Sequence, residues 1–354
     1  MGWFLTPGLT RGLFATNSHR SAPPSSNVLV LIQLTGGNDG LNTVIPLQDA
    51  AYHRLRPTLA IAPEDTLRLD GKHGLHPTCA GLHRLYQHGI ITLLPQVSAT
   101  QTAVGHFAAG EIWASGQIQS EGDTGWLGRW LDQRQVNEAY TDDPAAVFFG
   151  HHLPLALRAR APHKVVQFHA GEVLAHRPDR LCQHPRNRYP SGLFDRSLGM
   201  IVYLMRDHPA TQIYCLTLGG FDTHRDQTTQ HAKLLHALSE SLGTFQQDLE
   251  SHGLADRVMT MVWSEFGRQP AENDFRGTDH GTTGPVLLLG SRVNGGIVGD
   301  AMTATPEPSA ATDFRRIYAT LIEDWLASPA NAVFDRTWNK LPLVRNDAAY
   351  LPMP

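Results

Sequence analysis

The chain has 354 residues, of which 41% are hydrophobic and 18% are charged, enough to bury a substantial core. Its 29 basic and 33 acidic side chains give a formal net charge of −4 with no long basic run, which argues against a nucleic-acid surface. Three cysteines, widely spaced and odd in number, exclude a disulfide framework and a CxxC zinc pair. The 19 histidines make a metal site worth seeking.

The first 26 residues are predicted to be a flexible arm or a degraded export signal, ahead of a single domain over 27–354. Pro7 and Gly8 interrupt their apolar stretch, Arg11 follows it rather than precedes it, and no twin arginine occurs. No run approaches the roughly 20 apolar residues of a membrane span. Localisation and oligomeric state stay open.

Short apolar segments that do not alternate with polar residues are typical of parallel strands covered on both faces. Six such segments are predicted to be strands: Val28–Leu34, Ile90–Val97, Lys164–His169, Ile213–Leu218, Val258–Trp263 and Pro285–Leu289. Apolar residues at three- and four-residue steps predict a helix over His231–Ser251, and Thr312 is expected to cap a second one. Residues 116–160 are expected to form an excursion over the site.

Strands that alternate with helices indicate an α/β fold: a doubly wound, mostly parallel sheet with helices on both faces. In such a sheet, ligands bind beyond the carboxyl ends of the strands. Polar residues follow three of the predicted strands, and one further turn supplies a histidine. The residues are Asp39, Asp222 with His224, Glu265 and His280.

Carboxylates brought this close would repel one another unless a cation lies among them or some take up protons. Mixed oxygen and imidazole ligands suit Zn²⁺, Mn²⁺ or another divalent ion such as Mg²⁺ or Ca²⁺. Each motif alone has a simpler reading, since Gly-Asn-Asp-Gly is usually a turn and Asp-Thr-His a helix cap. Their joint register with the strand ends favours a site for one or two divalent metal ions.

The chain resembles the bacterial family known as domain of unknown function 1501, a branch of the alkaline-phosphatase and sulfatase-like superfamily. The resemblance spans almost the whole chain from about residue 28, and the joint order of its motifs is specific. The matching stretches are Leu34–Pro46 (LTGGNDGLNTVIP), Tyr52–Ala62 (YHRLRPTLAIA), Gly219–His224 (GGFDTH), Ser264–Arg268 (SEFGR), Gly277–Thr282 (GTDHGT) and Thr312–Arg315 (TDFR).

This resemblance implies one or two divalent metals at the strand ends and activity on phosphate or sulfate esters. By position, Asp222, His224 and His280 resemble the ligands of a first metal, and Asp39 and Glu265 those of a second. Phe266 stands where phosphomutase relatives carry a histidine, so a single-metal site is an alternative. Relatives are often exported to the periplasm.

The nucleophile has two readings. The stretch from Gln101 to Phe107 resembles the nucleophile turn of cofactor-independent phosphoglycerate mutases, which makes Thr102 the attacking hydroxyl and places His106 beside it. The family's Ser-His-Phe pattern instead aligns its serine with Gly105, which leaves a metal-activated water to attack. Thr102 as a helix cap and His106 as a structural residue is equally open. Arg268 is a candidate for holding an ester oxyanion, against an ordinary salt bridge.

The leading hypothesis is a metal-dependent hydrolase or transferase whose ligand is an anionic ester, a small molecule or a glycan. The alternative is a catalytically silent member of the superfamily that binds an anionic glycan or a protein partner. Two enzyme classes are excluded. The glycines around Asn38 lack the Gly-x-Gly-x-x-Gly spacing of dinucleotide binding, and no Gly-x-Ser-x-Gly of a serine hydrolase occurs.

Overall fold

The computed structural model describes residues 27–99, 105–117, 123–134, 142–175, 189, 192–300, 302–305 and 311–345. The predicted N-terminal arm over residues 1–26 and the predicted nucleophile Thr102 lie outside these residues. Within them, no helix is long and apolar enough to cross a membrane.

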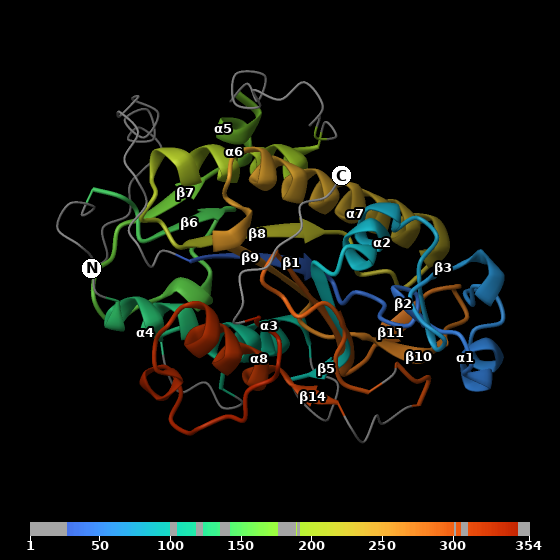
Figure 1. The fold of residues 1–354 in the computed structure, drawn as a ribbon. Helices are drawn as coiled ribbons and strands as arrows, with labels where there is room; N and C mark the ends of the chain where they lie inside the picture. The colour runs from blue at the N-terminus through green and yellow to red at the C-terminus, as the bar shows by residue number, and fades with distance from the viewer. Residues whose placement is uncertain are drawn as a thin grey trace.

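A nine-stranded sheet runs through the middle of the molecule (Figure 1). Its strand order is β13-β5-β12-β9-β1-β8-β6-β7, and β14 also pairs with β5. The strands are β1 (Val28–Thr35), β5 (Ile91–Ser98), β6 (Ala146–Phe149), β7 (Val165–Phe168), β8 (Ile213–Gly219), β9 (Val258–Trp263), β12 (Thr283–Leu289), β13 (Gly296–Ile297) and β14 (Thr312–Asp313). All six predicted strands are present.

The central strand β1 runs parallel to both neighbours, with Leu31 opposite Cys215 of β8 and Met261 of β9. The strand β12 is the exception, because it runs antiparallel to both β9 and β5. It shares the apolar sequence of its parallel neighbours since it is buried to the same extent. The predicted fold class, a mostly parallel α/β sheet, is confirmed.

Helices cover both faces of this sheet, above it and below it in Figure 1. The first face packs against α2 (Ala80–Gln87), α6 (Leu193–Asp207) and α7 (Gln227–Ser251). The second face packs against α3 (His106–Ser115), α4 (Trp126–Gln133) and α8 (Phe314–Thr320), which continues as a π-helical turn over Leu321–Trp325. The short helix α5 (Ala170–Ala175) contacts α6.

Two helix predictions are correct in kind and differ at their starts. The helix predicted over His231–Ser251 begins four residues earlier, at Gln227. The cap of α8 is Asp313 rather than Thr312, because the Asp313 carboxylate accepts a hydrogen bond from the Arg315 backbone N–H at 2.9 Å. Thr312 lies in β14 instead.

The stretch 116–160 was expected to form an excursion over the site. Its described part contains α4 and β6, and β6 is an internal strand between β8 and β7. Both belong to the body of the fold.

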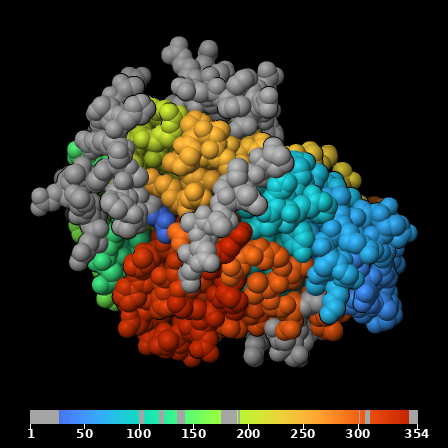
Figure 2. Space-filling model, viewed as in Figure 1, coloured from blue at the N-terminus to red at the C-terminus, as the bar shows by residue number. Residues whose placement is uncertain are grey.

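The amino-terminal part of the described chain gathers at one side of the molecule (blue to cyan in Figure 2). Smaller elements lie there, beside the main sheet. They include a three-stranded sheet, the helix α1 and the β10–β11 hairpin. Their bounds are β2 (Val44–Pro46), α1 (Ala50–Leu55), β3 (Leu67–Arg68), β4 (His73–Leu75), β10 (Arg268–Glu272) and β11 (Thr278–His280). Single 3₁₀ turns occupy Pro63–Asp65, Leu155–Leu157, Ala255–Arg257 and Ala330–Ala332.

Candidate metal centre

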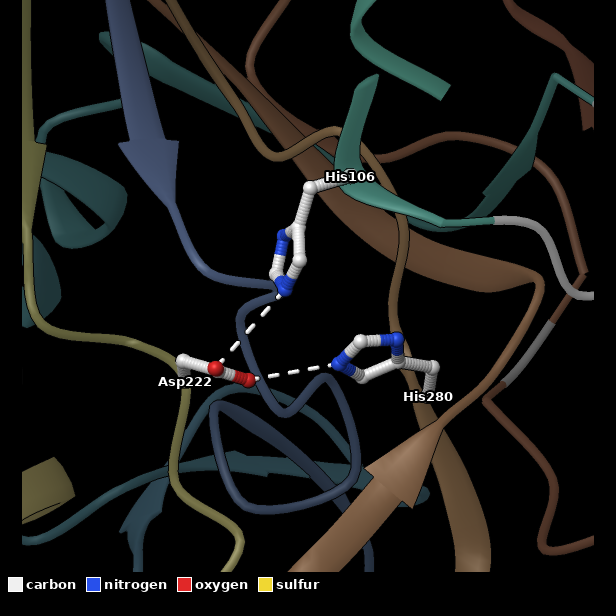
Figure 3. Close-up of side chains that lie close together, drawn as sticks. All are labelled: His106, Asp222 and His280. Carbon is white, nitrogen blue, oxygen red and sulfur yellow. Dashed lines mark hydrogen bonds and ion pairs between the residues drawn. The ribbon is translucent and has the colours of Figure 1, made fainter. Parts of the chain in front are cut away.

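Four side chains from separate parts of the chain point toward one another beyond the ends of β8 and β9. Asp222 and His224 lie on the loop after β8, His280 ends β11, and His106 begins α3. Figure 3 shows the carboxylate of Asp222 facing the imidazoles of both His106 and His280, with a dashed line to each. The sequence predicted Asp222, His224 and His280 as one set, and the fold brings them together.

The three predicted residues present their ligand atoms at short range. The Nε2 atom of His224 lies 3.0 Å from Nε2 of His280. Oδ1 of Asp222 lies 3.1 Å from His224 Nε2 and 3.3 Å from His280 Nε2. Ligand atoms held about 2.0–2.1 Å from a tetrahedral ion stand about 3.3 Å apart, so these separations fit one divalent ion.

The tautomer of His224 strengthens this interpretation. Its Nδ1 lies 3.1 Å from Oδ1 of Asp279, an acceptor-only carboxylate, so Nδ1 carries the proton in the neutral ring. The Nε2 atom then presents a lone pair to the Asp222 carboxylate. A divalent ion between two such electron-rich atoms would relieve their repulsion, as would a second proton on the ring.

His106 repeats the arrangement from the other side. Its Nδ1 lies 2.9 Å from Oε1 of Glu265, and its Nε2 faces Oδ2 of Asp222 at 3.7 Å. One ligand atom each of His106, Asp222 and His280 lies within 4.8 Å of the others. The ring of Phe266, which was noted to replace a histidine, packs against the imidazoles of His106 and His280, with centroids 4.9 and 4.4 Å apart.

Glu265 was predicted as a metal ligand, and the structure places it behind His106 instead. The side chain is only 4% exposed. Its Oε1 accepts hydrogen bonds from the Gly36 backbone N–H at 2.8 Å and from His106, and its Oε2 accepts from Gln33 at 3.4 Å. A carboxylate on the far nitrogen of a ligating histidine fixes the ring and its tautomer.

Local electrostatics keep the central groups in metal-binding states. Partial burial alone would raise the pKa of Asp222, but hydrogen bonds from Arg268 and His280 and the charge of Arg268 lower it. Burial lowers the pKa of His280; the hydrogen bond to Asp222 raises it in part, and the nearby Arg268 lowers it further. The carboxylate is therefore ionised and this imidazole neutral, as a divalent ion requires.

Arg268 was predicted to hold an ester oxyanion, but its guanidinium is fully buried within the protein. It donates to the carbonyl oxygens of Gly36, Gly37, Phe221 and Thr278. Its remaining contact is to Oδ1 of Asp222 at 2.7 Å. Arg268 thus ties the glycine turn after β1 to Asp222, rather than facing a substrate.

Asp39 also lies outside the group that the sequence predicted. Its carboxylate forms a bidentate pair with Arg56, at 2.6 and 3.0 Å, and both side chains are almost fully buried. Gln227 of α7 donates to the same carboxylate. The charge and hydrogen bonds of Arg56 outweigh burial and lower the pKa of Asp39. The five predicted ligands therefore form a cluster of three, with Glu265 behind His106 and Asp39 in a separate ion pair.

One residue of the site was missed. Asp279, which orients His224, stands directly before His280 in the Gly-Thr-Asp-His motif. An acid next to a predicted ligand was a usable signal for this role. Hydrogen bonds from Asn273 and His224 lower the pKa of Asp279.

Comparison with curated proteins found no significant match. Among solved structures, the lipoteichoic acid synthase LtaP from Listeria monocytogenes is similar at 11% identity and a TM-score of 0.39, over 77% of this chain and 68% of that one. The C-terminal periplasmic domain of EptC from Escherichia coli, a zinc complex, is similar at 10% identity and a TM-score of 0.41, over 76% of this chain and 74% of that one. A protein of the alkaline phosphatase superfamily from Vibrio parahaemolyticus is similar at 12% identity and a TM-score of 0.38, over 77% of this chain and 63% of that one. Likenesses this loose carry no information about the activity of this chain.

Part of the carboxyl-terminal half of the chain matches a family model directly. The match spans residues 195–335, which include Asp222, His224, Glu265 and His280 but neither the turn after β1 nor His106. The description of that family is "Protein of unknown function (DUF1501)", which is the family that the motifs predicted.

Proposed function

We propose that the chain is a divalent-metal-dependent hydrolase or transferase that acts on phosphate or sulfate esters. The observation that carries the proposal is the convergence of His224 Nε2, His280 Nε2 and Asp222 Oδ1 within 3.0–3.3 Å of one another. The resemblance to the alkaline-phosphatase and sulfatase-like superfamily supports the choice of ester.

Each residue of the centre has a separate task in this proposal. Asp222, His224 and His280 hold the ion, and His106 completes the ligand set. Such an ion polarises the ester and neutralises the charge that develops as the ester bond breaks. Glu265 and Asp279 hold His106 and His224 with their Nε2 atoms turned inward, and Arg268 keeps Asp222 ionised. Thr102 stays a prediction for the attacking hydroxyl, since Gly105 at the start of α3 offers none.

Metal titration of the purified protein tests the centre. Calorimetry with Mn²⁺ and Zn²⁺ should give one saturable site, and Asp222→Ala or His280→Ala should weaken binding by about 10–100-fold or more. His236, exposed on α7, supplies the control, because His236→Ala should bind like the unaltered protein. Absence of metal binding to the unaltered protein would sink the proposal.

A second candidate is a silent superfamily member that binds an anionic glycan or a protein partner. Two observations favour it: Asp39 forms an ion pair with Arg56, and Phe266 lies at a position where relatives carry a metal ligand. Turnover separates the two candidates. Hydrolysis of 4-nitrophenyl phosphate or sulfate that needs added metal and disappears in Asp222→Ala supports the enzyme, and metal binding without any turnover supports the silent member.

A further inference from the structure

A cavity of about 380 Å³ lies on the second face of the sheet, between the strands and the helices α3 and α4. Its walls are mostly apolar, and the aromatic side chains Trp113, Trp126, Trp263, Phe148 and Tyr318 are among them. Small-molecule sites in proteins are typically concave, mostly apolar and roughly 300–1,000 Å³ in volume. By size and lining, this cavity belongs to that class.

The aromatic walls hold one another in place. The rings of Trp113 and Trp263 are stacked with centroids 4.7 Å apart, and those of Trp126 and Tyr318 with centroids 4.1 Å apart. The hydroxyl of Tyr318 donates to the backbone carbonyl of Trp113 at 3.0 Å. Rings fixed in this way keep the cavity open without a ligand, so binding does not require the walls to reorganise.

The cavity reaches the surface at one end. Thr217 of β8 and the neighbouring His151 and His152 line it and are exposed to solvent. Gln33 lines it as well, and its side-chain amide donates to Glu265 at 3.4 Å. The few polar groups thus lie at the rim and on the side that faces the metal centre.

One face of α3 joins the cavity to the metal centre. His106 contributes to the centre, and Gly110, Trp113 and Ala114 line the cavity. These residues stand four, seven and eight positions after His106, which places all of them on one stripe of the helix. Since a helix rises about 1.5 Å per residue, Gly110 lies about 6 Å along the axis from His106. The near end of the cavity therefore lies within about two helical turns of the metal centre.

We propose that this cavity binds an aromatic group of the substrate, so that the preferred substrates are aryl esters rather than esters of small alcohols. The part of this inference that concerns ester substrates rests on the proposed function. The part that concerns binding of an aromatic group in the cavity does not. The anionic part of such a substrate lies at Asp222, His224 and His280, and its ring lies against the tryptophans.

Gly110 offers a way to fill the cavity without disturbing the fold. A Cβ atom built on it meets no heavy atom within 4 Å. Gly110→Leu should therefore place its side chain in the cavity. Glu111→Leu is the matched control, because it adds the same side chain to the exposed face of the same helix.

The first measurement uses 2-naphthol, an uncharged aromatic probe, with metal-free protein. Three tryptophans line the cavity, so binding should quench their fluorescence. The unaltered protein and Glu111→Leu should bind equally, and Gly110→Leu should bind about tenfold or more weakly. Absence of binding, or equal binding to Gly110→Leu with its fold intact by circular dichroism, would overturn the apolar site.

The second measurement compares the KM values of 1-naphthyl phosphate and methyl phosphate in the presence of metal. Gly110→Leu should raise KM about tenfold or more for the naphthyl ester and leave that of methyl phosphate unchanged. Equal changes for both esters would overturn the role of the cavity in substrate choice. Turnover of neither ester would contradict the proposed function, and the naphthol titration would still decide whether the cavity binds aromatic groups.

Discussion

His106 and His224 each place Nδ1 against a carboxylate, and the two carboxylates differ in their exposure to solvent. Glu265, behind His106, is 4% exposed, whereas Asp279, behind His224, is 59% exposed. Water competes with the exposed contact and weakens it, while the buried one is electrostatically stronger. The orientation of His106 should therefore depend more on its carboxylate than that of His224 does.

Replacing each carboxylate by its amide tests this difference. Glu265→Gln should lower metal affinity by about 10–100-fold, because the amide no longer favours the tautomer with its proton on Nδ1. Asp279→Asn serves as the matched variant and should lower affinity less. Calorimetric titration with Mn²⁺ measures both, and a larger loss in Asp279→Asn would contradict the assigned roles.

The close approach of the turn after β1 to Asp222 requires a glycine at position 36. Gly36 has φ of +118°, and a Cβ there would lie 2.3 Å from the Asp222 backbone nitrogen. Gly36→Ala should therefore lower the free energy of unfolding by roughly 2–6 kcal/mol, the sum of backbone strain and overpacking. Gly89 also has positive φ but faces open space, so Gly89→Ala should cost about 1–2 kcal/mol. Urea unfolding distinguishes the two, and equal losses would refute the steric explanation.

Asp222 and His224 could be predicted from the sequence because they follow a strand of the parallel sheet, at the edge where ligands bind. His280 could be predicted from the resemblance of its Thr-Asp-His motif. The roles of Asp39 and Glu265 could not. Their partners, Arg56 and His106, come from separate elements, and His106 is 159 positions from Glu265. Strand order places the backbone near the site, but which side chain faces which depends on packing that periodicity does not encode.

At the scale of elements, the Asp39–Arg56 pair joins the turn after β1 to the residue that ends α1. Arg56 also donates to the carbonyl oxygens of Gln269 and Pro270 in β10. Gln227 connects Asp39 to α7. Its Oε1 accepts hydrogen bonds from Thr223, on the loop that carries Asp222 and His224, and from Thr278, in the strand β11 that carries His280. The pair therefore stabilises the supports of the centre.

Removing the charge of Asp39 should affect stability more than metal binding. Asp39→Asn leaves Arg56 buried without its counter-charge, which typically costs about 3–5 kcal/mol. The exposed pair of Asp226 and Arg276 supplies the control, because Asp226→Asn should change stability little. Urea unfolding measures the loss, and calorimetry of the folded variant tests the site. A large fall in metal affinity with unchanged stability would restore Asp39 as a ligand.

Within the stretch that was expected to be an excursion, two glycines are packed against the backbone rather than exposed. Gly125 and Gly128, before and within α4, contributed to the prediction of an irregular excursion. A Cβ on Gly128 would lie 1.8 Å from the carbonyl oxygen of Arg158, so this glycine lets α4 approach the backbone of residues 155–159. Composition alone does not distinguish a glycine of a loop from one at a close contact. The four-residue strand β6 was not predicted, although β7, which has the same length, was.

At the scale of the molecule, the sheet separates two unlike environments near the metal centre. The face covered by α3, α4 and α8 holds the aromatic cavity, whereas the face covered by α7 holds a buried polar network beside Asp39. That network includes His231 and His76, whose rings meet edge to face at 6.1 Å between centroids. His231 donates from Nε2 to Oδ1 of Asn38 at 2.9 Å.

These two buried histidines should make the stability of the whole protein depend on pH. Burial lowers the pKa of His231 and of His76 to about 4 each, against an ordinary value of 6.5, although Asp39 raises both in part. Below pH 6.5 the unfolded chain takes up protons that the folded protein does not. The free energy of unfolding therefore decreases as the pH is lowered from 6.5 to about 4. In that window each histidine lowers the folding equilibrium constant by up to about tenfold per pH unit. Urea unfolding between pH 7 and 4.5 measures the slope, which should flatten in His231→Gln and persist in the exposed control His236→Gln. An unchanged slope in His231→Gln would mean that other groups carry the dependence.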